Sequence, residues 1–152
     1  MGMPRQPSKH HVWDGEKWEL DKEALLEEFR SQKIREIQQK SDSSIASITS
    51  GYTTGERESF AQQKKGASDI LNSAPSSEAT YVRDLADGRV LHGDTTLGGL
   101  EGEARYAAFA HQILQNAETA ELAALDVLCK QQGLEVRARL AETIEDLQAI
   151  TW

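Results

Sequence analysis

Apolar side chains recur at helical spacing along most of this chain. The first long stretch runs from Asp21 to Ser50. From Ile34 onward, every third or fourth position carries one residue of a stripe that continues just past this stretch: Ile34, Ile37, Ser41, Ile45, Ile48 and Tyr52. This spacing keeps the stripe on one face of a helix with about 3.6 residues per turn. Asp21 has a side chain suited to capping a helix N-terminus, and Gly51 ends the pattern. We therefore predict a helix over 21–50.

A capping sequence marks the start of a second helix. Thr53 and Glu56 have the spacing of a capping box, in which each side chain accepts a hydrogen bond from a backbone N–H at the helix start. The apolar pattern continues to Pro75, although Gly66 lowers helix stability by about 1 kcal/mol relative to alanine. Because the loop before this helix is short, the first two helices are expected to form an antiparallel hairpin. A third, shorter helix is predicted over 77–87.

Glycines separate these helices from a C-terminal helical unit. Residues 88–102 contain five glycines in fifteen positions, which predicts a loop. From Glu103 an alanine-rich helical pattern runs to Gly133, where a break is expected. The remaining residues are predicted to form one or two short helices, and Thr143 is expected to cap the last of them.

A turn flanked by tryptophans precedes the first helix. Asp14 and Gly15 form a hairpin turn signal, because glycine tolerates the positive φ that tight turns need, and Trp13 and Trp18 stand on either side. A hairpin this short is marginal unless its rings pack on a helix or on a partner. The proline-containing segment before it has the composition of a disordered arm.

The chain is therefore expected to be all-α, with antiparallel helical hairpins of long helices preceded by a short arm and a small β-hairpin. Four segments are expected: the arm and tryptophan hairpin at 1–20, a helical hairpin with a short helix at 21–89, the glycine-rich loop at 90–102 and a C-terminal helical unit at 103–152. The sequence leaves open whether the helices on the two sides of the loop pack together or splay apart.

Composition limits the classes of function. Only 38% of the 152 residues are hydrophobic and 6% are aromatic, which suits long packed helices better than a thick globular core. The net charge is −8 and no basic stripe is present, so nucleic-acid binding is not expected. No stretch approaches ~18 consecutive apolar residues, and no apolar signal region is seen. We therefore expect that the protein does not associate with a membrane. We also expect it to be synthesised and kept under cytosol-like conditions.

The residue types that perform enzyme chemistry are scattered along the chain. His10 and His11 lie in the arm, and Cys129 has no activating histidine or basic cluster nearby in sequence. The strongest metal candidate is the pair His92 and Asp94 in the glycine-rich loop, but no second pair at ligand spacing accompanies it. A small metal-dependent enzyme built on this pair is an alternative. The favoured expectation is no enzyme, with no catalytic residue, metal or cofactor.

Four short motifs follow one another along the chain. They are a Trp-x-Gly-x-x-Trp start, a Gly-Tyr…Glu-x-x-Ser-Phe-x-x-Gln turn, a Leu-Ala-x-x-Arg segment and a Thr-x-x-x-Leu-x-Ala-Ile-x-Trp end, carried by Trp13, Gly15, Trp18, Gly51, Tyr52, Glu56, Ser59, Phe60, Gln63, Leu85, Ala86, Arg89, Thr143, Leu147, Ala149, Ile150 and Trp152. In this order the motifs resemble a helical domain of uncharacterised function in tail-fibre and tail-fibre-assembly proteins of tailed bacteriophages.

The resemblance covers residues 12–89 and the last ten residues. It departs at Phe60, where such proteins more often have tryptophan, and at the Lys65-Gly66 pair, which replaces an acidic residue followed by alanine. The segments 91–102 and 134–141 do not align with it. The shared motifs are structural and none carries catalysis.

The resemblance implies a non-enzymatic, tail-fibre-associated connector that binds fibre or other tail subunits, in several copies or as a homo-oligomer. It also implies synthesis in the host bacterial cytoplasm and a place in the virion tail. The residues expected to meet a partner are Trp13, Trp18, Ile34, Ile37, Ile45, Ile48, Tyr52 and Phe60. Two alternatives stay open, namely a tail-fibre assembly chaperone absent from the virion and a coiled-coil scaffold unrelated to phage.

Overall fold

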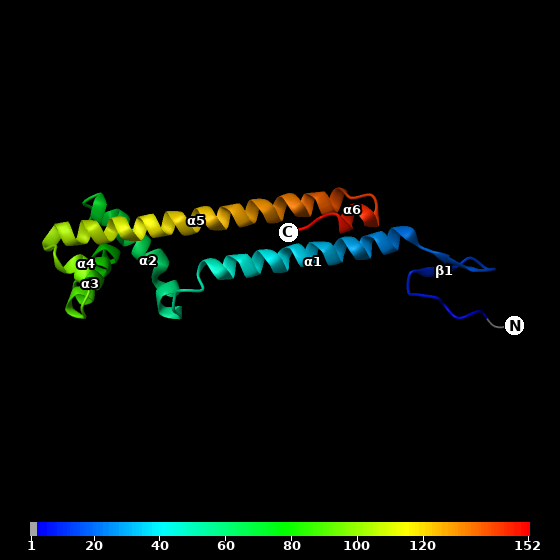
Figure 1. Ribbon diagram of the computed structural model, residues 1–152, viewed down its shortest axis with the longest axis horizontal. Coiled ribbons are helices and arrows are strands. Elements are labelled where there is room, and N and C mark those ends of the chain that lie inside the picture. The colour runs from blue at the N-terminus through cyan, green and yellow to red at the C-terminus, as the bar shows by residue number, and fades with distance from the viewer. Residues whose placement is uncertain (1–2) are drawn as a thin grey trace. The chain divides into compact units, whose positions relative to one another are not determined.

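The computed structural model describes residues 3–152, which are mainly helical (Figure 1). A small antiparallel β-hairpin near the N-terminus precedes the helices, so the predicted all-α class with a small N-terminal hairpin is confirmed. The elements in chain order are β1 (His11–Trp13), β2 (Trp18–Leu20), α1 (Lys22–Ile48), α2 (Thr54–Leu71), α3 (Ser77–Leu91), α4 (Thr95–Gly98), α5 (Gly102–Leu140) and α6 (Ile144–Gln148).

The chain folds into two compact units. Unit 1 comprises the residues up to Ser44 together with Asp126–Trp152, and unit 2 comprises Ile45–Leu125. The boundaries fall inside α1 and α5, and not at the glycine-rich loop. Each of these long helices therefore contributes one part to unit 1 and the other part to unit 2.

Unit 1 has its core between α1 and the C-terminal part of the chain. The buried residues of this core are Ile37, Ala138, Ala141, Leu147 and Ile150, and Leu26, Phe29, Ile34, Leu134 and Trp152 pack against them. Arg30 of α1 donates a hydrogen bond to the carbonyl of Ala138, near the end of α5. Ser41, which lies later in α1, donates a hydrogen bond to Gln131, which lies earlier in α5. Within unit 1, α1 therefore runs antiparallel to the end of α5, a segment far away in sequence.

Two cations of α1 satisfy carbonyl groups at helix ends. The Arg30 guanidinium donates from Nε to the carbonyl of Ala138 at 3.0 Å and from Nη2 to that of Ala141 at 2.6 Å. Lys33 Nζ donates to the carbonyl of Ile150 at 3.0 Å, just beyond α6. The last carbonyls of a helix lack intrahelical partners and carry partial negative charge, so these cations are well placed.

The predicted break at Gly133 is wrong, because α5 continues as one helix to Leu140. Packing explains the difference. Leu134 and Ala138 reach the core of unit 1, and Glu135, which is only 7% exposed, accepts hydrogen bonds from Gln38 and Gln131. The cost of one glycine in a helix interior, about 1 kcal/mol, is smaller than the stabilisation that such contacts supply.

Unit 2 is built on a close contact between α2 and α3. Its buried core consists of Ala67, Ile70, Ala79, Val82, Ala86, Leu97, Phe109 and Ala110, drawn from α2, α3, α4 and the first part of α5. Gly66 lies where α2 meets α3, and a Cβ added there would stand 2.2 Å from the Glu78 carbonyl oxygen and 2.6 Å from a methyl carbon of Val82. The glycine that weakens α2 in isolation therefore permits its closest packing.

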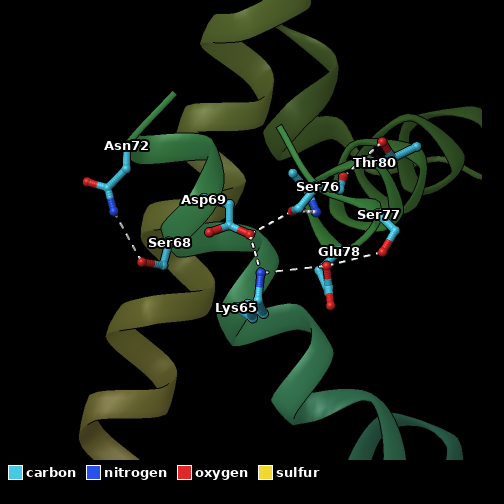
Figure 2. Close-up of polar contacts among 9 residues, drawn as sticks. Lys65, Ser68, Asp69, Asn72, Ser76, Ser77, Glu78 and Thr80 are labelled. Atoms are coloured by element: carbon cyan, nitrogen blue, oxygen red, sulfur yellow. Dashed lines mark hydrogen bonds and ion pairs between the residues drawn. The ribbon is translucent and has the colours of Figure 1, made fainter. Parts of the chain in front are cut away.

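Polar side chains connect α2 to the start of α3, as Figure 2 shows. The Lys65 ammonium lies 2.7 Å from the Asp69 carboxylate and 3.6 Å from that of Glu78. Ser76 donates its hydroxyl to Asp69 at 2.6 Å, and its Oγ also accepts the Ala79 backbone N–H as the N-cap of α3. The turn is thus held by one charge network and one helix cap.

The glycine-rich segment 90–102 is not wholly a loop. The third helix extends past its predicted end to Leu91, and a short helix α4 follows. Asp94 caps α4 by accepting the backbone N–H groups of Thr96 and Leu97, and Leu97 is buried in the core of unit 2. The high glycine content of this segment predicted a loop and gave no sign of the short helix α4, which the buried Leu97 anchors to the core.

Acid is expected to destabilise unit 2. The Lys65 ammonium and the Ser76 hydroxyl hold the pKa of Asp69 below its usual 3.8, and hydrogen bonds from Tyr106 and Arg105 lower the pKa of Asp87 in the same way. Because these carboxyls bind protons less readily in the folded chain than in the unfolded one, their stabilisation is present above pH 3.8 and is lost as the pH falls through the lowered values.

Thermal unfolding recorded between pH 5 and pH 2 measures this effect, with a falling Tm as the expected result. Asp69→Asn is expected to lower the Tm at neutral pH and to flatten its dependence on pH below 4. Asp84→Asn, at an exposed carboxyl on α3, is the control and is expected to keep the parent profile. An Asp69→Asn profile that coincides with that of the parent contradicts the assignment.

Candidate partner-binding surfaces

An open groove with a volume of about 740 Å³ lies in unit 2. It is lined by residues from the loop before α2, from α2 and α3, and from the first part of α5. These include Tyr52, Phe60, Tyr81, Leu85, Arg89, Phe109, Ile113, Ala117, Ala120 and, at its edge, Glu56, Gln63, Lys64, Gln112, Asn116 and Glu121. A groove of this size with a mainly apolar lining is typical of a site that receives side chains of a ligand or of another protein.

Aromatic packing forms part of the groove lining. The rings of Tyr52 and Phe60 meet edge to face, with centroids 4.9 Å apart and planes at 90°. Phe109 is only 3% exposed, and the Arg89 guanidinium lies 4.8 Å from the centroid of its ring. Edge-to-face pairs and cation–π contacts hold aromatic rings in defined positions. The lining is therefore ordered before any partner arrives.

Small residues of α5 leave the groove open. Ala117 and Ala120 lie one turn apart on the part of α5 that faces the groove, and both are half-buried. An alanine fills less space than the leucine or isoleucine found elsewhere on this helix, such as Ile113. The apolar surface between α2 and α5 is consequently not closed by side chains of this unit.

The charged groups at the groove edge already have partners. Lys64 of α2 and Glu121 of α5 form an ion pair, and Glu56 accepts the Thr53 backbone N–H in the predicted capping box. Gln63 donates to the Ser59 hydroxyl at 2.7 Å. These polar groups of the groove lining therefore already take part in intramolecular contacts.

The two tryptophans form a second aromatic surface, in unit 1. Trp13 and Trp18 are paired residues of the β1–β2 hairpin, their ring centroids lie 5.4 Å apart, and both are half-buried. Trp18 Nε1 donates to the Pro4 carbonyl at 2.7 Å, which fixes part of the N-terminal arm. Gly15, with φ of +103°, makes the predicted turn. Residues 1 and 2 of the predicted arm lie outside the described residues.

An electrostatic contact attaches the arm to α1. Lys9 and His10 both lie against the Glu28 carboxylate, and a hydrogen bond from Lys9 is the main reason why the pKa of Glu28 is lowered. The arm, which the sequence predicts to be disordered when isolated, is therefore attached to α1 of the same unit through these residues. Trp13 and Trp18 keep an exposed part of their rings for other contacts.

The isoleucines predicted to meet a partner have different environments. Ile37 is 3% exposed and belongs to the core of unit 1, and Ile34 packs against that core, so both already have intramolecular neighbours. Ile45 and Ile48 are half-buried and belong to unit 2. Tyr52 and Phe60 are brought together at the groove. Of the predicted set, only this last pair lines it.

Sequence reasoning missed the groove residues of α3 and α5. Tyr81 and Leu85 share a face of α3, and Ile113 and Ala117 share a face of α5, but each pair conforms to an ordinary core pattern. Periodicity shows that a face is apolar and does not show whether another helix covers it. The missing information is therefore the position of the neighbouring helices.

The proposed metal pair in the glycine-rich segment serves local structure. His92 ends α3 and is exposed, whereas Asp94 caps α4 and lies 2.9 Å from Arg89. Within residues 3–152, no three or more His, Cys, Asp or Glu side chains cluster in an arrangement that could hold a metal ion. Asp94 is thus used by a helix cap and an ion pair.

Comparison with protein-family models, with curated proteins and with solved structures found no match. In the part of the chain that the structure describes, no helix has both the length and the apolar character needed to cross a membrane.

Proposed function

We propose that this protein is a non-enzymatic interaction module whose groove in unit 2 binds an apolar segment of another protein in a larger assembly. The observation that carries the proposal is the open apolar surface between α2 and α5, lined by the Tyr52–Phe60 pair. Grooves of this kind suit an amphipathic segment that inserts a few anchor side chains. Aromatic residues at the lining supply much of the binding energy in such interfaces.

The polar groups support a binding role over a catalytic one. Glu56 caps α2, Lys64 pairs with Glu121, and Arg89 is shared between the Phe109 ring and Asp94. Each of these groups thus has a structural task at or beside the groove. A reaction would need a nucleophile or a base directed at a bound substrate, and each of these groups instead contacts a neighbouring residue of the chain.

The finer proposal is a tail-fibre-associated component of a tailed bacteriophage, which stays in the virion as a connector between fibre or other tail subunits. It rests on the motif order described above, which runs from the tryptophan hairpin through Gly51-Tyr52 and Ser59-Phe60 to the C-terminal Trp152. On this proposal the protein is made in the bacterial cytoplasm and carried into the tail during assembly. A tail-fibre assembly chaperone is the alternative within the same resemblance.

Co-expression with candidate fibre subunits tests the groove. The parent chain is expected to co-purify with its partner, whereas Ala117→Arg, which fills the groove with a long charged side chain, is expected to reduce binding at least tenfold. Leu91→Arg is the matched control, because Leu91 is 81% exposed, lies in unit 2 and does not line the groove. Circular dichroism checks that both variants keep the parent helicity. Equal binding by all three chains would remove the groove from the proposal.

Mass spectrometry of purified virions separates the connector from the chaperone. A connector is expected at a fixed stoichiometry with the fibre subunits, whereas an assembly chaperone is expected in infected cells and not in virions. A chain that binds no tail or fibre subunit but forms helical oligomers by itself would instead support a scaffold unrelated to phage.

A further inference from the structure

The N-terminal arm is attached to the rest of unit 1 mainly by polar contacts. Its described residues, 3–10, include no member of either buried core, and Met3 is 58% exposed. An attachment without much apolar burial lacks the contribution that usually outweighs the conformational entropy lost when a segment becomes ordered. The attached and released forms of the arm are therefore close in free energy.

One carboxylate holds the base of the arm against α1. Lys9 Nζ lies 2.5 Å from Oε1 of Glu28, and the His10 ring contacts the other carboxylate oxygen. The Lys9 side chain is 72% exposed and that of Glu28 is 26% exposed, so both are accessible to water and salt. Exposed ion pairs contribute little to stability and are screened by added salt. Removing the single charge of Glu28 therefore weakens both contacts at once.

A hydrogen bond joins the far end of the arm to the tryptophan hairpin. Trp18 Nε1 donates to the Pro4 carbonyl at 2.7 Å, and this bond lies at the surface. The arm thus lies against the N–H edge of one ring of the Trp13–Trp18 pair. When the arm is released, this edge of the ring is open to solvent or to another molecule.

The base of the arm provides a pivot. The Asp21 backbone N–H donates to the His10 carbonyl at 2.7 Å, which extends the bonding of the β1–β2 hairpin beyond its strands. The remaining side-chain bonds of the arm join residues no more than five positions apart, and they do not reach α1 or β2. The segment before His10 can therefore leave Glu28 and Trp18 while the hairpin stays paired.

We propose that residues 3–10 form a reversible strap, which is held by Glu28 and partly covers the Trp13–Trp18 pair. A change that weakens the contacts at Glu28 releases the strap and uncovers the indole N–H edge of Trp18. The proposal does not depend on the groove of unit 2, because all the residues of the strap and its contacts lie in unit 1.

Solvent exchange of the indole N–H groups, measured by NMR, tests the strap. The exchange rate at Trp18 is expected to rise about threefold to tenfold in Glu28→Gln, the range that two partly exposed charge contacts support. A similar rise is expected for the parent chain between about 0.01 M and 1 M NaCl, because the Debye length falls from about 30 Å to about 3 Å. Glu23→Gln, at an exposed carboxyl on the same helix, is the matched control and is expected to keep the parent rate.

The indole of Trp152 is the internal reference, because its ring packs against the core of unit 1. Its exchange rate is expected to stay constant under all these conditions. An unchanged rate at Trp18 in Glu28→Gln, or a rate that rises with the substitution but not with salt, would overturn the proposal. A parallel rise at Trp18 and Trp152 would also overturn it, because unit 1 as a whole would then have loosened.

Discussion

Replacing Gly66 with alanine is expected to destabilise unit 2 by about 3 kcal/mol, at the upper end of the usual cost of overpacking. An alanine Cβ at this position would stand 2.2 Å from the Glu78 carbonyl oxygen and 2.6 Å from its carbon. Both are backbone atoms of α3, so α2 and α3 have to separate to admit the methyl group. The gain in helix propensity, about 1 kcal/mol, has the opposite sign and is too small to offset this.

Chemical unfolding of the parent and the variant measures the difference in free energy. Gly88→Ala is the matched control, because Gly88 also lies within a helix, but an added Cβ there meets no atom within 4 Å. That substitution is expected to stabilise the chain by about 0.5–1 kcal/mol. If Gly66→Ala were as stable as the control, the close approach of α2 and α3 would not be a requirement of the fold.

Replacing Phe109 with alanine is expected to cost about 3–5 kcal/mol, the usual range for removing a buried phenylalanine ring. Phe109 is 3% exposed and belongs to the buried core that joins α2, α3 and α4 to α5. The change leaves a cavity and also removes the ring over which the Arg89 guanidinium lies at 4.8 Å. The structure around a helix crossing of this kind closes such a cavity only in part.

Amide hydrogen exchange shows where this loss occurs. Protection is expected to fall in α2 and α3, whereas amides in α6 of unit 1 are expected to change less, because their core contains no residue of the Phe109 cluster. Leu91→Ala, at an 81% exposed leucine, is expected to change the free energy of unfolding by less than about 0.5 kcal/mol. An equally small change for Phe109→Ala would contradict the assignment of this ring to the core.

Local signals predicted the helix starts well. Asp21 accepts the Ala24 backbone N–H at 3.0 Å, Thr53 and Glu56 form both bonds of the capping box, and Thr143 accepts the Asp146 backbone N–H at 3.0 Å. Each of these interactions joins residues three positions apart. Their geometry is therefore set by the chain itself, and a sequence pattern is sufficient to identify them.

The candidate groove was only partly predictable. Tyr52 and Phe60 were selected from the sequence and lie together at the groove, but Trp13, Trp18, Ile34 and Ile37 lie in unit 1. Periodicity marked the contributing faces of α3 and α5 as apolar, but it gave no signal that these faces line a groove. A groove depends on which helices pack beside each other and on how much space their side chains leave. The apolar pattern of one helix predicts neither of these.

The sequence by itself therefore determined the helical class, the caps, the hairpin turn at Gly15 and the apolar face of each long helix, because these depend on residues within a turn or two of one another. Only the tertiary structure decided that Gly66 permits a close helix contact and that α5 continues through Gly133. A glycine lowers the intrinsic stability of a helix by a similar amount at both positions. Its effect on the fold depends on which distant residues pack beside it, such as Glu78 beside Gly66 and α1 beside the end of α5.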